Sequence, residues 1–318
     1  MDAIISVKRF DPDSRERSSH YQDYELEMDD SSTVLDGLIT IREDIDGTLA
    51  FRCSCRSAIC GSCTVRINGR AALACNTKIV DAKPRTGSPI VVEPAGNMDV
   101  IKDLVVDFKF FWDSVKSVEP WIQPSGPVPD QEYLASNESM LHLAEVMTCI
   151  MSGACVSDCT VIGVDSNFLG PAALAKAYRF VADPRDNADT ARLGHLDKYG
   201  GMWDCTRCMV CTDVCPKGVA PMDRIMALRD KALEAGFTKT YGARHANAFA
   251  ELVEHGGTLD ELRLPIKTFG IFNIKEMLKL IPVGIRSFRA GKVPPIFHKS
   301  IPGVENVQRI FEKVEKKR

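Results

Sequence analysis

The alternation of apolar and polar residues near the start of the chain predicts a small mixed sheet with one helix. Four segments have the pattern of strands: residues 4–10, 21–28, 64–67 and 70–74. The last two flank Asn68-Gly69, a dipeptide that favours a tight hairpin turn. Residues 33–43 are typical of a short helix capped at Ser32. We therefore expect a first domain of the α+β class over residues 1–105.

Beyond that domain the pattern changes to helical spacing. Phe108 and Trp112, for example, lie four positions apart, as on one face of a helix. The helix candidates are residues 101–118, 139–148, 171–181, 221–235 and 274–288. Prolines concentrated in residues 119–129 indicate a linker. We expect a helical domain over residues 106–235 and a basic helical extension, for docking to a partner or a membrane, over residues 236–318.

The composition is that of a soluble globular protein, with 45% apolar and 26% charged residues in a chain of 318. A chain of this length is expected to form about two domains. No apolar run approaches the roughly 18 residues that a transmembrane helix needs. The first residues lack the basic and apolar regions of a secretory signal, so we expect none in this chain.

Basic residues gather toward the C-terminal end. Residues 267–318 contain 12 Lys and Arg against 4 Asp and Glu, whereas the whole chain has a net charge of −3. Nucleic-acid binding by the whole chain is therefore not expected. Within this region, residues 274–288 predict an amphipathic helix interrupted at Pro282. Its apolar face suits a partner protein, its own domain or an anionic membrane surface.

Cysteine is the residue type that carries the chemistry. The 12 cysteines fall into three groups: Cys53, Cys55, Cys60, Cys63 and Cys75; Cys149, Cys155 and Cys159; and Cys205, Cys208, Cys211 and Cys215. Disulfide bonds are disfavoured, because no secretory signal is expected and the neighbours are too close in sequence to pair comfortably. Structural zinc is a second alternative, but the spacings favour iron–sulfur clusters.

The first group has the C-x4-C-x2-C…C spacing of a plant-type [2Fe–2S] site. Its predicted ligands are Cys55, Cys60, Cys63 and Cys75. Small residues in the loop allow backbone N–H groups to point at the sulfurs; they are Ser57, Ala58, Gly61 and Ser62. Cys53 is left over, and a buried small thiol is the preferred interpretation over a ligand.

The third group is the cysteine run of bacterial ferredoxins, in which the fourth cysteine binds the other cluster. Its members are Cys205, Cys208, Cys211 and Cys215, followed by Pro216. The second group has the same spacing but carries a serine at its second position: Cys149, Ser152, Cys155 and Cys159. Exchange of the fourth cysteines predicts two cubane-type sites.

The site named cubane two is predicted to hold a [4Fe–4S] cluster through Cys159, Cys205, Cys208 and Cys211. The site named cubane one is predicted to use Cys149, Cys155 and Cys215. Ser152 is either the fourth donor of cubane one or a small residue beside an open iron corner. Both [4Fe–4S] and [3Fe–4S] therefore stay open at cubane one.

These three groups, in this order, resemble the iron–sulfur subunit of succinate dehydrogenase and fumarate reductase. The resemblance covers roughly residues 1–235. It is closest over residues 51–63, 168–174, 177–180 and 211–218, with Asp183 and residues 185–186 continuing the third stretch. It implies a plant-ferredoxin-like (β-grasp) first domain, a bacterial-ferredoxin-like helical second domain, and clusters in a line that pass electrons between a flavoprotein and a quinone. The FAD and the dicarboxylate site then belong to the partner, and no catalytic residue is expected here.

The chain departs from the common family pattern at several positions. Cys208 fills a position that common members leave without cysteine, where they hold a [3Fe–4S] centre. Ser152 departs in the opposite sense: at cubane one, a serine stands at a cysteine position of the run. Thr160 replaces a proline, and residues 161–164 lack the aromatic side chains that line the quinone pocket of common members. The resemblance therefore does not extend to the usual quinone site.

The C-terminal third is similar to the tail of the small iron–sulfur subunit of heterodisulfide reductases. The similar stretches are residues 275–289, 291–295, 298–299 and 307–317. This similarity implies a partner with cysteine-rich CCG domains, as in methylmenaquinol-linked fumarate reductases, in place of a haem-bearing membrane anchor. A membrane-anchor subunit stays the alternative partner. The similarity favours fumarate reduction with electrons from a quinol such as menaquinol.

Two functions follow as hypotheses. The first is an electron-transfer subunit of a succinate/fumarate oxidoreductase, peripheral on the cell membrane. We expect the cytoplasmic side by default, with the periplasmic side as the alternative if the flavoprotein carries a twin-arginine signal. The second is the electron-transfer module of a heterodisulfide-reductase-like, thiol-driven enzyme. A free ferredoxin-like carrier is disfavoured by the long tail.

Overall fold

The computed structural model describes residues 1–14, 18–293, 295 and 298–315. Of the tail similarity to heterodisulfide reductases, Pro294 and residues 316–317 therefore lie outside the described residues. The chain divides into two compact units, Met1–Asp230 and Lys231–Arg318, each of which is described by itself. None of the described helices is long and apolar enough to cross a bilayer.

A mixed five-stranded sheet forms the first part of unit one, in the order β2-β1-β5-β3-β4. Its strands are β1 (Asp2–Arg9), β2 (His20–Glu27), β3 (Thr64–Ile67), β4 (Arg70–Leu73) and β5 (Ile90–Glu93). Strand β1 runs antiparallel to β2 and parallel to β5, which pairs antiparallel with β3. The four predicted strands are present, and β5 joins the two hairpins.

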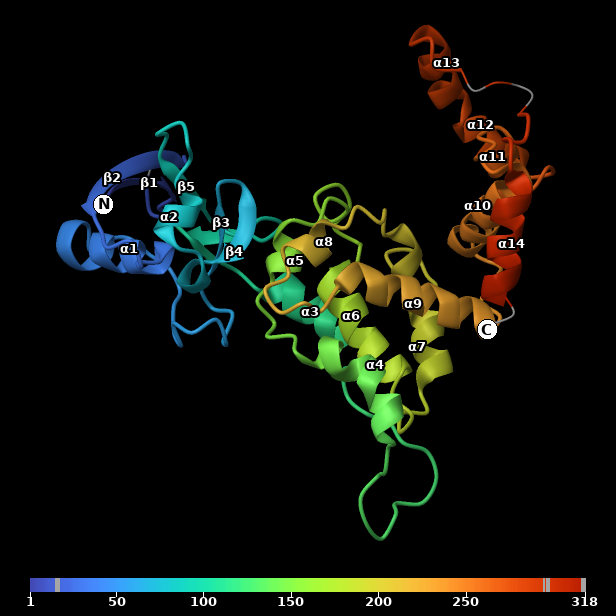
Figure 1. The fold of residues 1–318 in the computed structure, drawn as a ribbon, viewed down its shortest axis with the longest axis horizontal. Helices are drawn as coiled ribbons and strands as arrows, with labels where there is room; N and C mark the ends of the chain where they lie inside the picture. Colours follow the sequence, from blue (N-terminus) through green and yellow to red (C-terminus); the bar gives the residue numbers. More distant parts are fainter. Residues whose placement is uncertain (15–17, 294, 296–297, 316–318) are drawn as a thin grey trace. The chain divides into compact units, whose positions relative to one another are not determined.

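Helix α1 (Val34–Thr40) packs on the sheet through apolar residues that recur at helical spacing (Figure 1). It is capped by Thr33, one residue later than predicted, because Thr33 and Asp36 form a reciprocal capping box. Gly37 lies where α1 crosses β1, since a side chain there would approach within 2.6 Å of Ile5. The helix continues as a π-helical turn, Ile41–Ile45. A short helix, α2 (Ile79–Ala82), precedes β5.

The predicted helix over residues 101–118 is wrong in its first part. Two short strands, β6 (Val100–Lys102) and β7 (Val105–Val106), form a hairpin there, and helix α3 begins at Lys109. Asp103 explains the difference. Its buried carboxylate accepts hydrogen bonds from the Arg9 side chain and from the backbone N–H of Ala50, and its φ of 45° turns the chain. These distant partners override the local helical spacing.

The rest of unit one is helical. Its helices are α3 (Lys109–Ser117), α4 (Asn137–Met147), α5 (Ala154–Ser157), α6 (Gly170–Val181), α7 (Asp189–Leu196), α8 (Val210–Asp213) and most of α9 (Pro221–Glu234), which ends in the first residues of unit two. Helix α6 is almost wholly buried and packs against α3, α4, α5 and α7 (Figure 1). Small residues such as Ala173 and Ala177 allow this close packing. Arg192 donates to the Val118, Glu119 and Trp121 carbonyls and so holds the start of the proline-rich linker.

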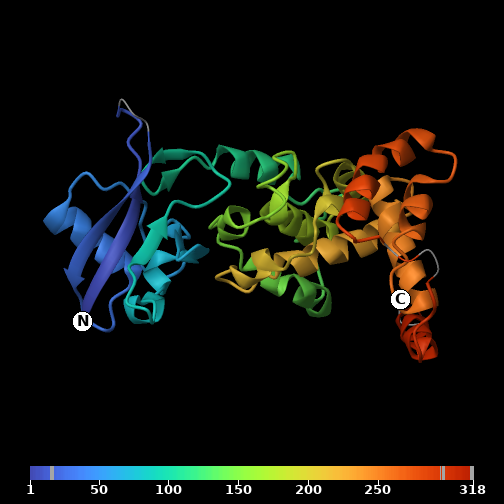
Figure 2. The same cartoon turned by 90° about the horizontal axis from the view of Figure 1, so that it is seen from above.

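The elements of unit two among the described residues are helices. They are α10 (Tyr241–Gly256), α11 (Arg263–Phe269), α12 (Ile274–Lys279), α13 (Ile281–Arg289) and α14 (Val304–Glu315). Helices α11 and α14 pack against α10, whereas α13 packs mainly against α12. Figure 2 shows the same elements from above. The predicted amphipathic helix over 274–288 is broken at Leu280, two residues before Pro282, whose ring lacks an N–H donor.

Candidate metal centres

The β3–β4 hairpin brings the ends of the first cysteine group together. Cys63 immediately precedes β3 and Cys75 follows β4, so antiparallel pairing places them side by side. The backbone N–H of Cys75 donates to the Cys63 sulfur at 3.5 Å, and the N–H of Ala74 donates to the Cys63 carbonyl at 3.0 Å. The loop that carries Cys55 and Cys60 then lies over this pair.

Backbone N–H groups in that loop point at sulfur atoms, as the small residues predicted. Ser57, Ile59 and Cys60 donate to the Cys55 sulfur at 3.4, 3.4 and 3.3 Å. Ala58 donates to the Cys75 sulfur at 3.4 Å. Residues in left-handed conformation, among them Ala58 at φ 54°, curl the backbone inward. Such a nest of N–H groups favours negative charge, as on thiolates and cluster sulfides.

The thiols of this loop differ in acidity. Hydrogen bonds from the Ser62 side chain and from the backbone of Cys55 and Ser62 lower the pKa of Cys60 to about 6. Burial raises the pKa of Cys63 to about 12, and negative charge on Cys75 and Cys60 adds to that effect. Metal binding removes the proton from such a thiol. Four gathered thiols with N–H donors aimed at their sulfurs fit a [2Fe–2S] cluster, and Cys53 packs against the apolar core instead.

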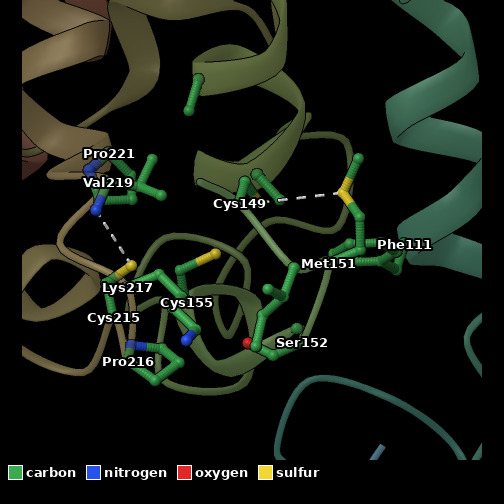
Figure 3. Close-up of a pocket in the computed structure, with 14 residues that line it drawn as sticks. Phe111, Cys149, Met151, Ser152, Cys155, Cys215, Pro216, Lys217, Val219 and Pro221 are labelled. Carbon is green, nitrogen blue, oxygen red and sulfur yellow. Dashed lines mark hydrogen bonds between the residues drawn. The ribbon is translucent and has the colours of Figure 1, made fainter. Parts of the chain in front are cut away.

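A hollow in the helical part brings together the residues predicted for cubane one (Figure 3). Cys149, Ser152, Cys155 and Cys215 all line it. Gly153, at φ 76°, turns the chain into α5, which carries Cys155. The Val219 N–H donates to the Cys215 sulfur at 3.4 Å. Burial raises the pKa of Cys155 well above its usual value, and nearby thiolates raise it further; they are Cys149, Cys211, Cys215 and Cys159.

The residues predicted for cubane two also lie together. Burial raises the pKa of Cys211 to about 12, and negative charge on its neighbours adds to the shift; they are Cys205, Cys159 and Cys208. Cys208 is exposed. Partial burial opposes ionisation of Cys208, but hydrogen bonds from Thr160 and the backbone outweigh it and lower its pKa. The Thr160 hydroxyl lies 3.5 Å from the Cys208 sulfur.

The fourth cysteine of each group lies near cysteines of the other group. Cys159, from the second group, lies with the third group, and Cys215 lies with the second. Sites lined by thiols, with Ser152 among them at cubane one and N–H groups aimed at several of the sulfurs, fit iron–sulfur clusters.

Contacts between the sheet and the segment that bears Cys155 and Cys159 were missed by sequence reasoning. The side-chain amide of Asn97 donates to the carbonyls of Val156, Ser157 and Cys159 at 2.8, 3.1 and 2.9 Å. The Gly96 N–H donates to the Ser157 hydroxyl at 2.9 Å. Asn97 stands in a left-handed turn at φ 57°, and a Gly-Asn turn signal at residues 96–97 was the only local sign of this position.

A second set of contacts involves Asp158. Its carboxylate accepts a hydrogen bond of 2.7 Å from the Ala71 N–H in β4, and the Arg66 guanidinium of β3 lies 3.3 Å from its other oxygen. The hairpin that places Cys63 beside Cys75 is thus tied to the chain between Cys155 and Cys159. These bonds fix the first site relative to the cubane segment.

Arg229 is another residue that the motifs did not indicate. Its buried guanidinium donates to the carbonyls of Met202, Trp203 and Cys205 at 2.9, 2.9 and 2.7 Å. Burial and the nearby Arg207 lower its pKa to about 10, which leaves it protonated at neutral pH. Arg229 therefore places a positive charge near Cys205, the first cysteine of the third group, and holds the backbone there in position.

Two models of protein families match the chain. Residues 4–113 match a 2Fe-2S iron–sulfur cluster binding domain, and residues 145–219 match a 4Fe-4S dicluster domain. Together they cover all eleven cysteines predicted as ligands, together with Cys53 and Ser152.

Curated relatives match over most of their length. The fumarate reductase iron–sulfur subunit of Mycobacterium tuberculosis is 40% identical over 71% of this chain and 91% of its own. The 8-methylmenaquinol:fumarate reductase iron–sulfur subunit of Wolinella succinogenes is 32% identical over 91% of this chain and 90% of its own. Among solved structures, a chain of the Mycobacterium smegmatis Sdh1 complex in the apo form superposes with a TM-score of 0.67 at 26% identity, covering 75% of this chain and 98% of that one.

Proposed function

The chain belongs to the family of iron–sulfur subunits of succinate dehydrogenase and fumarate reductase, and from this premise we propose that it relays electrons between a quinone-linked partner and a flavoprotein that holds FAD and the dicarboxylate site. The observation that carries this proposal is the gathering of three cysteine groups into three sites in one chain. The clusters would supply one-electron transfer when bound.

The residues that would hold each cluster follow from the donor sets. Cys55, Cys60, Cys63 and Cys75 would hold the [2Fe–2S] cluster. Cubane two would be a [4Fe–4S] cluster on Cys159, Cys205, Cys208 and Cys211. At cubane one, Ser152 lines the same hollow as Cys149, Cys155 and Cys215, which supports a [4Fe–4S] cluster with the serine oxygen as fourth donor over a [3Fe–4S] cluster.

The chain would also set the positions of the clusters and the electrostatic environment around them. Inward N–H groups at Cys55 and Cys75 stabilise negative charge on the sulfurs, and Cys211 is buried whereas Cys155 is half-buried. We infer that residues 1–105 form a β-grasp ferredoxin-like domain, that residues 106–235 form the two-cubane domain, and that residues 236–318 serve docking.

We infer that the quinone-linked partner is a CCG-domain subunit and that the natural direction is fumarate reduction. A match that covers 91% of the chain must extend past residue 266, so the methylmenaquinol-linked relative shares part of the tail. The quinone motif of common members is absent at residues 161–164. The chain would then sit peripherally on the membrane within its complex, and the flavoprotein's N-terminus would decide on which side.

Metal and sulfide analysis is the first test of this function. The anaerobic protein should contain about ten iron atoms with matching acid-labile sulfide, or about nine if cubane one is a three-iron cluster. Stoichiometric zinc with little sulfide would overturn the proposal. In the assembled complex, fumarate should oxidise reduced clusters and a quinol should re-reduce them.

A thiol-driven, heterodisulfide-reductase-like module is the second candidate function, supported by the tail similarity. The same complex distinguishes the two. Reduction of the clusters by a dithiol, with no response to fumarate, succinate or quinol, would favour the second function and exclude the first.

A further inference from the structure

Helices α12 and α13, together with the preceding turn, expose an unusual amount of apolar surface. The exposed side chains, here called the tail stripe, are Phe272, Ile274, Leu278, Ile281, Ile285 and Phe288. Within each helix they are three or four residues apart, so they share one side. Neither helix, both of which lie wholly within the described residues, has a buried side chain. The described part of the chain therefore does not cover this stripe.

The position of α13 within unit two agrees with that exposure. Figure 1 shows α13 at one end of the unit, beyond α12 and away from α10 and α14. Helix α14, in contrast, packs against α10. An amphipathic helix whose apolar side stays exposed in its own unit needs another surface for that side.

The charged residues around the tail stripe indicate which kind of surface would cover it. Between Arg263 and Gly303 the sequence contains eight Lys and Arg but one acidic residue, Glu276. Four of the cations lie on the two helices, at Lys275, Lys279, Arg286 and Arg289, beside the stripe and not within it. Protein interfaces usually have a rim of mixed polarity, whereas cations beside an apolar stripe match anionic headgroups above acyl chains.

Aromatic residues occupy both ends of the stripe. Phe272, in the turn before α12, is 94% exposed, and Phe288 is 75% exposed near the end of α13. Exposed phenylalanines on an amphipathic helix can enter the boundary between headgroups and acyl chains. From the stripe, its flanking cations and these aromatic ends, we propose that α12–α13 binds directly to an anionic lipid surface with the helices lying in the interface.

This surface goes beyond the electron-transfer function and can be tested without it. The full chain, with its clusters reconstituted anaerobically, would be floated with vesicles of phosphatidylcholine alone and with vesicles that also contain phosphatidylglycerol. Binding should be strong on the anionic vesicles, weak on the neutral ones, and should decrease as salt rises. Absence of binding to anionic vesicles would overturn the proposal.

Two substitutions on one helix provide a matched pair. Ile285 and Val283 are both 48% exposed, yet they lie two residues apart and therefore on nearly opposite sides of α13. Ile285→Glu should lower the vesicle partition coefficient by about tenfold or more, because a charge replaces a side chain that the lipid would bury. Val283→Glu should lower it less than Ile285→Glu, because only the added negative charge opposes binding on that side.

The outcomes separate lipid from protein as the occupant. Equal loss in both variants would contradict a directed lipid-facing side. Assembly with a partner subunit that Ile285→Glu abolishes, in a chain that does not bind vesicles, would assign the stripe to a protein interface and overturn lipid binding. Iron content and helical circular dichroism should match the unsubstituted chain in both variants. Deletion of residues 267–318 is a poorer test, since it cuts α11 and removes α14 from α10.

Discussion

Gly61 and Ser152 are in direct contact: a Cβ atom on Gly61 would lie 2.8 Å from the Cα of Ser152. Gly61 belongs to the loop between Cys60 and Cys63, and Ser152 lies between Cys149 and Cys155. The loop of the first site therefore touches the loop of cubane one at Gly61, where there is no room for a side chain.

Gly61→Ala should force these two loops apart. The left-handed φ of 73° costs alanine roughly 1–2 kcal/mol, and the clash with Ser152 should add about 1–3 kcal/mol. Gly69→Ala is the control, because Gly69 has φ 81° with no atom near its missing Cβ. Unfolding should be easier in both, but weaker magnetic coupling between the reduced [2Fe–2S] and cubane-one clusters is expected in Gly61→Ala alone. Unchanged coupling there would contradict the contact.

Ser152→Cys should produce a cubane site with four thiolates. Serine oxygen is a harder and more basic donor than thiolate, so its replacement should shift one midpoint potential upward. Redox titration followed by electron paramagnetic resonance measures this shift, and Ser152→Ala shows the site with no fourth donor. Identical titrations and spectra for Ser152→Cys and the unsubstituted protein would place Ser152 off the cluster.

Cys208→Ala should convert cubane two into a three-iron cluster of higher potential, which is the pattern of common family members. Iron should fall by about one atom per chain, and the oxidised protein should gain a three-iron resonance signal. Cys53→Ala is the matched cysteine control, since Cys53 packs on the apolar core. Retention of all iron after Cys208→Ala would show that Cys208 is not a ligand.

Asn97→Ala should loosen the joint between the sheet and α5. Three carbonyls lose their donor, which should cost about 2–4 kcal/mol in stability. Asn68 offers a control, because it too has a positive φ and two side-chain hydrogen bonds, but both stay within the sheet region. Both variants should unfold more easily. A change in magnetic coupling between clusters is expected for Asn97→Ala, and its appearance in Asn68→Ala as well would argue against a specific joint.

Acid should weaken the buried charge group around Asp183. Hydrogen bonds from Arg185 and Arg179 outweigh burial and hold the pKa of Asp183 well below its usual range. The folded pKa is depressed, so the carboxylate stabilises the fold above about pH 4 and this contribution is lost as pH falls below that value. Asp183→Asn should cost about 3 kcal/mol at neutral pH and reduce the fall in melting temperature on acidification. Asp165→Asn, at an exposed carboxylate, should have a much smaller effect.

The spacing of residues along the chain predicted the features that depend on only a few neighbouring residues. The cysteine runs indicated which sulfurs gather, because a few residues of loop or helix determine which side chains can reach one cluster. The hairpin at Asn68-Gly69 is likewise present, and it is what places Cys63 beside Cys75.

Long-range partners explain the errors and omissions. The chain around Asp103 forms a hairpin in place of the predicted helix, because the Asp103 carboxylate binds Arg9, 94 residues away along the chain. Asn97 reaches the Cys159 carbonyl across 62 residues, and Arg229 reaches the Cys205 carbonyl across 24. Neither hydrogen bond produces a periodic pattern in the sequence, so residue spacing alone could not have predicted it.

The exchange of Cys159 and Cys215 between the cubane sites has a topological consequence. With the proposed ligands, each cluster is a cross-link between the same two segments, 149–159 and 205–215. The first cluster to bind closes the intervening chain into a ring, and the chain loses conformational entropy in that step. The second cluster joins segments that are already held together, so its binding costs little further entropy. Cluster insertion should therefore be cooperative, with singly loaded chains scarce during maturation, and loss of one cluster should leave the ring closed by the other.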